Sequence, residues 1–207
     1  MKEKSYRIIV SIIAVLVMVL ILLILVKTAR AVDRCQDYLN DVRSQHIRYF
    51  GLQYPYWYGL GQLKQESACR ANITAFDGGQ GIAQFMPATL KDVQTRIGEK
   101  LNPYNPQQAI RMQAFYMLSV HKGNKLSGKP LWATYQGYNG GWKWLYLENQ
   151  RANSSNWSDM KLQCQRKTIT LPKGGLLSFC TVNYDYSQRI SKYGKQYQVG
   201  KDGMRFW

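Results

Sequence analysis

The pattern of apolar and polar positions divides the chain into one continuous apolar run and a much longer amphipathic part. Residues 8–26 are apolar except for Ser11, and basic residues lie on both flanks of the run. Its length matches what a helix needs to cross a bilayer and exceeds the apolar part of a typical signal peptide. We therefore predict a transmembrane anchor over 8–26, preceded by a basic cytoplasmic N-terminus at 1–7. A signal peptide cleaved near Ala29–Ala31 is the alternative, and both interpretations place the remaining chain outside the cytoplasm.

Beyond the apolar run, apolar residues recur at intervals of three and four, which is the spacing of one helical face. This spacing and its capping residues predict helices over 32–50, 57–67, 87–97, 105–121, 131–138, 142–150 and 184–197. The segment 71–81 has neither helical nor strand periodicity and is rich in Gly, Asp and Asn, so we expect a loop there. Two short apolar runs flank 172–175 and predict a hairpin. The pattern indicates a mainly α domain over 32–207 with a small hairpin-like insertion at 151–181.

Charge narrows the choice of partners. The 207 residues are enough for one domain and an appendage, and their formal net charge of +16 predicts an anionic partner. Nucleic acid, anionic lipid and an acidic cell-wall polymer all qualify. Because Lys and Arg are spread along the chain and no zinc-finger or RRM motif occurs, we do not expect nucleic acid as the primary partner.

The cysteines point to an exported protein. They are Cys35, Cys69, Cys164 and Cys180. Neither they nor the two histidines have the spacing of a metal site, so we expect no metal. An even number of cysteines in an exported chain is typical of disulfides, and three pairings are possible. We prefer Cys35 with Cys69 and Cys164 with Cys180, with buried free thiols as the alternative.

One carboxyl group lies at the end of an apolar stripe. Glu66 follows Trp57, Leu60 and Leu63 on one face of the predicted helix over 57–67. Burial disfavours the charged form of a carboxyl group and keeps it protonated near neutral pH. Cleavage of a glycosidic bond needs such a proton donor. Glu66 is therefore the candidate catalytic acid, while an ordinary glutamate in the last turn of a surface helix is the alternative.

The residues around Glu66 form an ordered set of motifs. Glu66-Ser67, followed by Gly-Ile-Ala-Gln-Phe-Met-Pro-Ala-Thr at 81–89, resembles the Glu-Ser and Gly-Leu-Met-Gln…Met-Pro-Ala-Thr motifs of the soluble-lytic-transglycosylase (SLT) domain, a goose-lysozyme-like family. Tyr138-Asn139 is similar to that family's Ala-Tyr-Asn, with glycine in place of the alanine. The matches cover roughly residues 56–141, and a weaker one follows near the C-terminus.

The resemblance implies a lysozyme-like fold and a lytic transglycosylase that needs no metal or cofactor. Such enzymes cleave the β-1,4 bond between N-acetylmuramic acid and N-acetylglucosamine in peptidoglycan and leave a 1,6-anhydro product. By the resemblance, Glu66 first protonates the leaving oxygen and then accepts the proton of the muramic C6 hydroxyl. The substrate-binding residues that it implies are Ser67, Gln84, Met86, Tyr138, Asn139 and Tyr186.

Two departures from the family pattern keep other functions open. Val182 stands where the C-terminal motif has a glutamate, and Tyr186 aligns best with its tyrosine, with Tyr184 as the alternative. The insertion at 151–181 is also longer than the family's usual connection. A catalytically idle glycan-binding or assembly subunit therefore stays open, as does a DNA-handling protein at a membrane surface. Asp77 leaves open a hydrolysing muramidase, although capping a turn is the usual role of an aspartate in such a loop.

The biological setting follows from the resemblance as an expectation. Small anchored enzymes of this type resemble the wall-opening factors of secretion or conjugation machines and the virion-associated enzymes of membrane-containing phages. We expect peptidoglycan strands, a membrane and a virion or a secretion or conjugation complex as partners. The expected location is a single-pass membrane protein with its catalytic domain on the periplasmic or cell-wall side, or the membrane of a phage virion.

Overall fold

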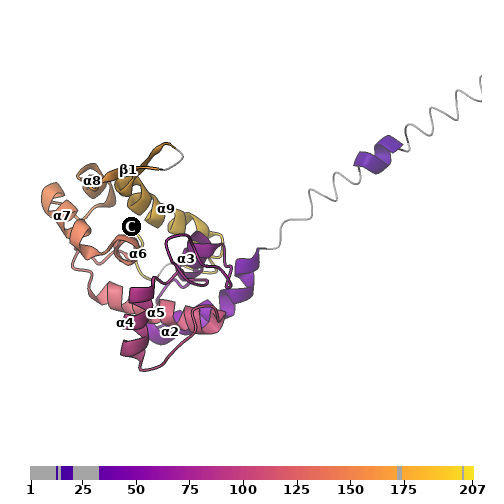
Figure 1. Cartoon of the computed structure of the whole chain (residues 1–207), viewed down its shortest axis with the longest axis horizontal. Coiled ribbons are helices and arrows are strands. Elements are labelled where there is room, and N and C mark those ends of the chain that lie inside the picture. The colour runs from indigo at the N-terminus through magenta and orange to yellow at the C-terminus, as the bar shows by residue number, and fades with distance from the viewer. Residues whose placement is uncertain (1–12, 14, 21–32, 172–173, 202) are drawn as a thin grey trace, which may run out of the picture. The chain divides into compact units, whose positions relative to one another are not determined.

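The computed structural model describes residues 13, 15–20, 33–171, 174–201 and 203–207, which fall into two compact units, Met1–Asp33 and Arg34–Trp207. In the first unit only residue 13, the helical stretch 15–20 and Asp33 are described (Figure 1). Most of the predicted membrane anchor at 8–26 therefore lies outside the described residues. Among the helices that the structure does describe, none combines the length and the hydropathy needed to cross a bilayer.

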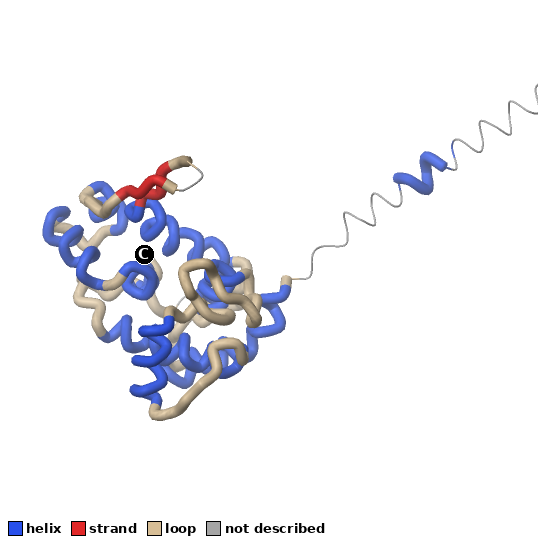
Figure 2. Tube along the Cα trace, viewed as in Figure 1, coloured by secondary structure: helices blue, strands red, loops and turns tan. Residues whose placement is uncertain are grey.

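The second unit is mainly helical, with one small two-stranded sheet (Figure 2). Its elements in chain order are η1 (Arg34–Tyr38), α2 (Leu39–Phe50), α3 (Trp57–Ser67), α4 (Pro87–Ile97), α5 (Pro106–Lys122), α6 (Leu131–Gly140), α7 (Trp142–Ala152), α8 (Trp157–Leu162), β1 (Thr168–Thr170), β2 (Leu176–Ser178) and α9 (Phe179–Lys195). The mainly α class with a small hairpin is confirmed. The predicted bounds of α3 and α4 agree with the structure.

Three elements differ from the sequence-based prediction. The first predicted helix, 32–50, is a 3-10 turn followed by α2. The six-residue helix α8 was not predicted, because it is shorter than the window in which a helical period can be recognised. Helix α9 begins at Phe179 instead of Tyr184, since the Ser178 hydroxyl accepts a hydrogen bond from the Thr181 backbone N–H and caps the helix earlier.

Both preferred disulfides are present. Cys35 pairs with Cys69 and ties η1 to the segment after α3, and Cys164 pairs with Cys180 at the base of the hairpin. The hairpin strands β1 and β2 are antiparallel, with Ile169 opposite Leu177. No free cysteine remains, so the free-thiol alternative is wrong. Disulfides of this kind persist in oxidising, extracytoplasmic compartments.

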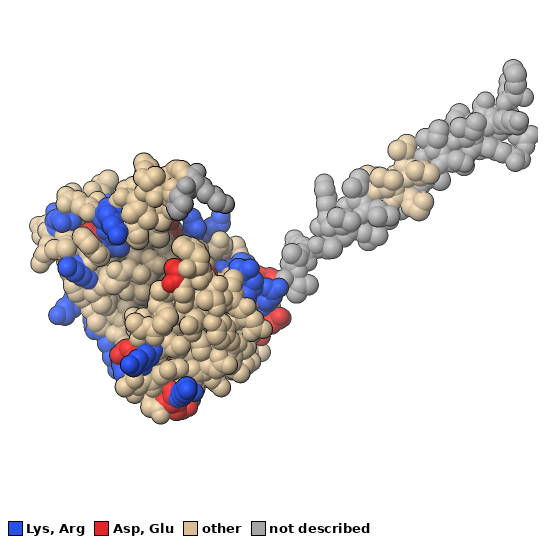
Figure 3. All heavy atoms as spheres, in the orientation of Figure 1, with Lys and Arg blue, Asp and Glu red and all other residues tan. Residues whose placement is uncertain are grey.

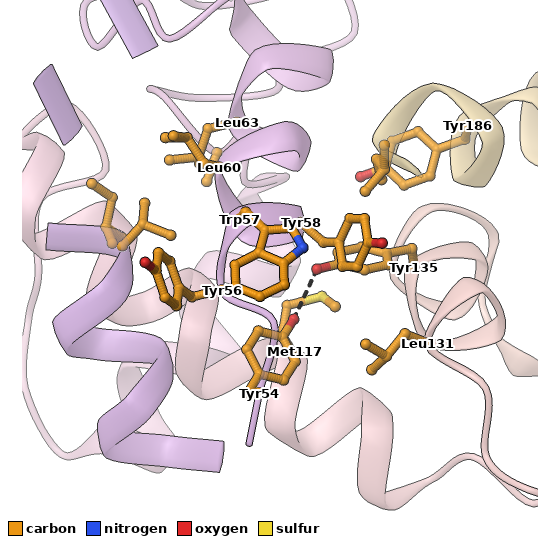
Figure 4. Close-up of a cluster of buried hydrophobic side chains, with 14 of the residues drawn as sticks. Tyr54, Tyr56, Trp57, Tyr58, Leu60, Leu63, Met117, Leu131, Tyr135 and Tyr186 are labelled. Carbon is orange, nitrogen blue, oxygen red and sulfur yellow. Dashed lines mark hydrogen bonds between the residues drawn. The ribbon is translucent and has the colours of Figure 1, made fainter. Parts of the chain in front are cut away.

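Helix α3 lies in the core and packs most extensively against α9. A side chain at Gly61 would approach the backbone nitrogen of Gly194 to 2.6 Å, so the contact requires glycine on the α3 side. This close approach sets the register of the two helices and thus the side chains that face each other across them. Aromatic rings from several helices fill the core, and the hydroxyls of Tyr54 and Tyr135 are hydrogen-bonded at 2.8 Å (Figure 4).

Candidate active site

A groove with a cavity volume of about 700 Å³ lies between the end of α3, the loop that follows it, α6, the hairpin and α9. Lys and Arg side chains are scattered over the face shown in Figure 3 and do not gather into one patch there. Most of the predicted site residues line this groove. They are Glu66, Gln84, Met86, Tyr138, Asn139 and Tyr186.

Ser67 is the predicted site residue that does not appear among the described lining residues. Its side chain is buried, and its hydroxyl donates to the backbone oxygen of Ile82 at 2.8 Å and accepts from the backbone N–H of Arg70 at 3.1 Å. The hydroxyl thus joins the end of α3 to the loop that carries the next motif. These contacts give Ser67 a role in positioning this loop, and its role in substrate binding stays a prediction.

Glu66 is partly buried in the last turn of α3. Burial, opposed by a hydrogen bond from Tyr186 and assisted by the negative charge of Asp77, raises the pKa of Glu66 to about 7 from an ordinary value of 4.5. A large fraction of the carboxyl group is therefore protonated near neutral pH. Glu66 can both donate and accept a proton in that range.

A chain of hydrogen bonds leads from the core to Glu66. The Gln113 side-chain amide donates to the Gln62 side-chain oxygen at 2.8 Å, and the Gln62 amide donates to the Tyr186 hydroxyl oxygen at 3.0 Å. The Tyr186 hydroxyl in turn donates to Oε1 of Glu66. Because the tyrosine oxygen already accepts from Gln62, its single proton is directed to the carboxyl group. Burial and the neighbouring Glu66 carboxyl group raise the pKa of Tyr186 well above its ordinary value, so its hydroxyl stays protonated and remains a donor.

The alternative tyrosine, Tyr184, belongs to a different network. Its hydroxyl donates to Oε2 of Glu148 at 2.7 Å, and Arg166 binds the same carboxylate through two hydrogen bonds at 2.8 and 3.1 Å. The Arg166 backbone N–H also donates to the sulfur of Cys180 at 3.3 Å. Tyr184 therefore helps to attach the base of the insertion to α7 and α9, away from Glu66.

The remaining predicted residues form the other side of the groove. Gln84 has a left-handed backbone conformation with φ 52°, and its amide donates to a backbone oxygen of its own loop at 2.7 Å. The Tyr138 hydroxyl donates to the backbone oxygen of Ala83 at 3.0 Å, which links α6 to that loop. The Asn139 side-chain oxygen accepts from the Asn183 amide of α9 at 3.0 Å. These bonds hold the three motif segments in one arrangement around Glu66.

Comparison with known proteins identifies a domain within the chain. Residues 60–159 match the family model described as the transglycosylase SLT domain. The chain contains an SLT domain. Among solved structures it is similar to the 70 kDa soluble lytic transglycosylase Slt70 from Escherichia coli, with a TM-score of 0.58 and 18% sequence identity. The similarity covers 79% of this chain and 26% of that chain, so this protein spans about a quarter of Slt70's length. No curated protein sequence matches it significantly.

Asp77 is the nearby carboxylate that a hydrolysing enzyme would use as a base. In this SLT domain its Oδ1 accepts a hydrogen bond from the backbone N–H of Gly79 at 3.2 Å, which caps the turn of the loop. The Asp77 side chain also lines the groove, where its charge contributes to the raised pKa of Glu66. The turn-capping interpretation agrees with this contact.

The groove is also lined by residues that the sequence analysis missed and that lie outside the stretch matched by the family model. They come from β2 and from one face of α9 and include Leu176, Leu177, Thr181, Asp185 and Arg189. Val182 lies there as well, at the position where the family pattern has a glutamate. The signal that predicts the α9 set is helical spacing, because Val182, Tyr186 and Arg189 recur at intervals of four and three and so share a face.

Proposed function

We propose that this protein is a lytic transglycosylase that cleaves the β-1,4 bond between N-acetylmuramic acid and N-acetylglucosamine in peptidoglycan. The observation that carries the proposal is a partly buried carboxyl group, Glu66, which has a pKa of about 7 and lies at the wall of a groove in a chain that contains an SLT domain. An acid that is half protonated near neutral pH suits a reaction in which one group gives a proton and then takes one back.

In the proposed reaction the protonated Glu66 gives its proton to the bridging oxygen while the bond from that oxygen to muramic C1 breaks. The Glu66 carboxylate then accepts the proton of the C6 hydroxyl while the C6 oxygen bonds to C1, which closes the 1,6-anhydro ring. Protons balance without water, since the nucleophile belongs to the substrate and already lies close to C1. The hydrogen bond from Tyr186 stabilises the carboxylate between the two transfers.

The other groove residues suit the binding of a sugar polymer. Gln84 and Asn139 bring side-chain amides that can hydrogen-bond hydroxyl and acetamido groups. Met86 is 41% exposed and offers an apolar surface to the C–H face of a sugar ring. Tyr138 closes this side of the groove, and burial raises its pKa, so its hydroxyl stays protonated.

The test is product analysis on purified peptidoglycan. The wild-type chain should release 1,6-anhydro muropeptides, and Glu66→Gln should reduce the rate by about 10²–10⁴-fold, the usual contribution of general acid–base catalysis. Asp77→Asn is the matched control and should retain 1,6-anhydro products. Products with reducing ends alone, lost in Asp77→Asn, would show a muramidase instead. Binding to peptidoglycan without any cleavage would show an idle glycan-binding subunit.

The N-terminal apolar run supplies a second part of the proposal. Residues 8–26 tether the domain to a membrane, with the groove on the extracytoplasmic side where both disulfides can form. Fractionation of cells or particles that contain the full chain tests this directly. Release of the full-length chain by salt alone would contradict a membrane anchor, and copurification with a virion or an envelope complex would identify the setting.

A further inference from the structure

A second groove, larger than the first, lies elsewhere on the domain. Its cavity volume is about 1030 Å³, and among the described residues it shares no lining residue with the groove of Glu66. Its walls come from the loop before α6, the last turns of α7, the segment that leads into α8 and the C-terminal segment that ends at Trp207. The reaction proposed above uses none of these residues.

The aromatic side of this groove is held in place by backbone and side-chain contacts. The backbone N–H of Leu131 donates to the Arg205 carbonyl at 3.0 Å, and the next residue repeats this bond with Phe206, which attaches the C-terminal segment to α6. The rings of Trp157 and Trp207 meet edge to face, with centroids 5.8 Å apart. The indole N–H of Trp157 is already satisfied by a serine hydroxyl on α9. The groove thus presents indole surfaces whose orientation is fixed in advance.

The polar side of the groove consists of amides and hydroxyls. Its described lining residues include three asparagines, one glutamine and four serines, but no acidic residue, and Arg205 supplies the one cation among them. Gln150, Asn153 and Arg205 are exposed, and none of the side-chain hydrogen bonds found in the described part of the chain involves them. These three groups are therefore available to a ligand.

This combination selects one class of ligand. A lipid or an apolar peptide would need a mainly apolar wall, and a nucleic acid would need several cations for its phosphates. Indole surfaces beside neutral amides instead match a sugar ring, which has an apolar C–H face and a rim of hydroxyl and acetamido groups. One guanidinium suits the isolated carboxylates that peptidoglycan carries.

We propose that this second groove binds a glycan segment of peptidoglycan away from the cleaved bond. The inference rests on the proposed function for the identity of the polymer. With both grooves engaged, the second contact becomes intramolecular, so the enzyme stays on a long or insoluble substrate between cleavage events. Short soluble fragments that fill only the groove of Glu66 gain nothing from the second one.

The binding test uses full-length Glu66→Gln, which should not degrade its ligand, in co-sedimentation with purified insoluble peptidoglycan. Trp207→Ala in this background should weaken binding about tenfold, the effect expected of a central aromatic contact. Gln150→Glu should weaken it similarly, because it places a negative charge against an anionic polymer. It alters an exposed side chain, so it keeps the test valid should Trp207→Ala fail to fold.

Trp144→Ala is the matched control. Trp144 is 38% exposed, close to the 39% of Trp207, and it lines neither groove among the described residues. Its substitution should leave sedimentation unchanged. If Trp207→Ala and Gln150→Glu both sediment like the Glu66→Gln parent, the glycan assignment is wrong and a protein ligand becomes the better candidate for the groove.

Kinetics with Glu66 intact separate this inference from the proposed function. Gln150→Glu should raise KM on insoluble peptidoglycan about tenfold and leave kcat and KM on a soluble tetrasaccharide fragment unchanged. If the wild type cleaves peptidoglycan and Gln150→Glu has the same KM as the wild type on each of the two substrates, only the proposal for the second groove is overturned. Loss of sedimentation in the variants, with no 1,6-anhydro product from the wild type, overturns only the transglycosylase assignment.

Discussion

The raised pKa of Glu66 predicts a stability effect that can be measured without substrate. In Glu66→Gln the side chain keeps its size and its hydrogen-bonding capacity but cannot ionise. The wild-type carboxyl group has a pKa of about 7 in the folded state, against about 4.5 when exposed to water. The two proteins should therefore respond differently to pH in their free energy of unfolding.

The direction in which the free energy of unfolding changes with pH follows from proton binding. Below about pH 4.5 the carboxyl group is protonated in both states of the wild type and adds no pH dependence. Between about pH 4.5 and 7 the unfolded chain releases the proton while the folded chain keeps it, so the wild-type free energy of unfolding falls as pH rises. Above about pH 7 the carboxyl group is ionised in both states, and the wild type has lost the full amount of stability. The free energy of unfolding of Glu66→Gln does not fall in this way, because its side chain does not ionise.

The magnitude comes from the two pKa values. Each pH unit between them is worth about 1.4 kcal/mol, so the upper limit is about 3 kcal/mol. Glu66 is only partly buried, and the water that reaches it screens the charge, which reduces the expected effect to about 2 kcal/mol. From pH 4 to pH 8, Glu66→Gln should therefore gain about 2 kcal/mol of stability relative to the wild type.

The assay is urea unfolding of both proteins at several pH values, followed by circular dichroism, with the disulfides intact. Comparing the two proteins at each pH removes the contribution of every other titrating group. A difference in free energy of unfolding that stays constant within about 0.5 kcal/mol from pH 4 to pH 8 would refute the reasoning, because it would mean that folding does not perturb Glu66. The same perturbation predicts that cleavage declines about tenfold per pH unit above about pH 7, as the acid form is lost.

Two further substitutions test the arrangement around the site. Gln62→Leu removes the donor that directs the Tyr186 proton to Glu66, so kcat should fall about tenfold with little change in KM. Steady-state kinetics on a soluble fragment measure both constants, and an unchanged kcat would contradict the orienting role of Gln62. Gly81 has φ 70°, and Gly81→Ala would force a side chain against the Pro103 carbonyl, so it should lower the free energy of unfolding in urea by more than about 2 kcal/mol. Gly98 has a similar φ of 79° but open space around it, so Gly98→Ala should lower it by about 1 kcal/mol. Equal losses for the two glycines would argue against the collision.

Local pattern determined most of the secondary structure. The stripe of Trp57, Leu60 and Leu63 specified α3 and placed Glu66 on its apolar side, because helical periodicity is a property of adjacent turns. The proline and asparagine that begin α5 also act within one turn. Where the signal was shorter than a helical period, as in α8, or depended on one capping serine, as in α9, the prediction failed or began at the wrong residue.

The tertiary structure decided which side chains meet. The resemblance favours Tyr186 as the partner of Glu66 and leaves Tyr184 as the alternative. The register of α9 against α3 decides between them, because it directs Tyr186 to Glu66 and Tyr184 to Glu148. That register depends on a close contact between Gly61 and residues far along the chain. Tertiary structure also decides the partners of Gln62, the hydrogen bonds of the Ser67 hydroxyl and the whole second groove. Each depends on contacts between distant segments, for which neither periodicity nor a motif contains a signal.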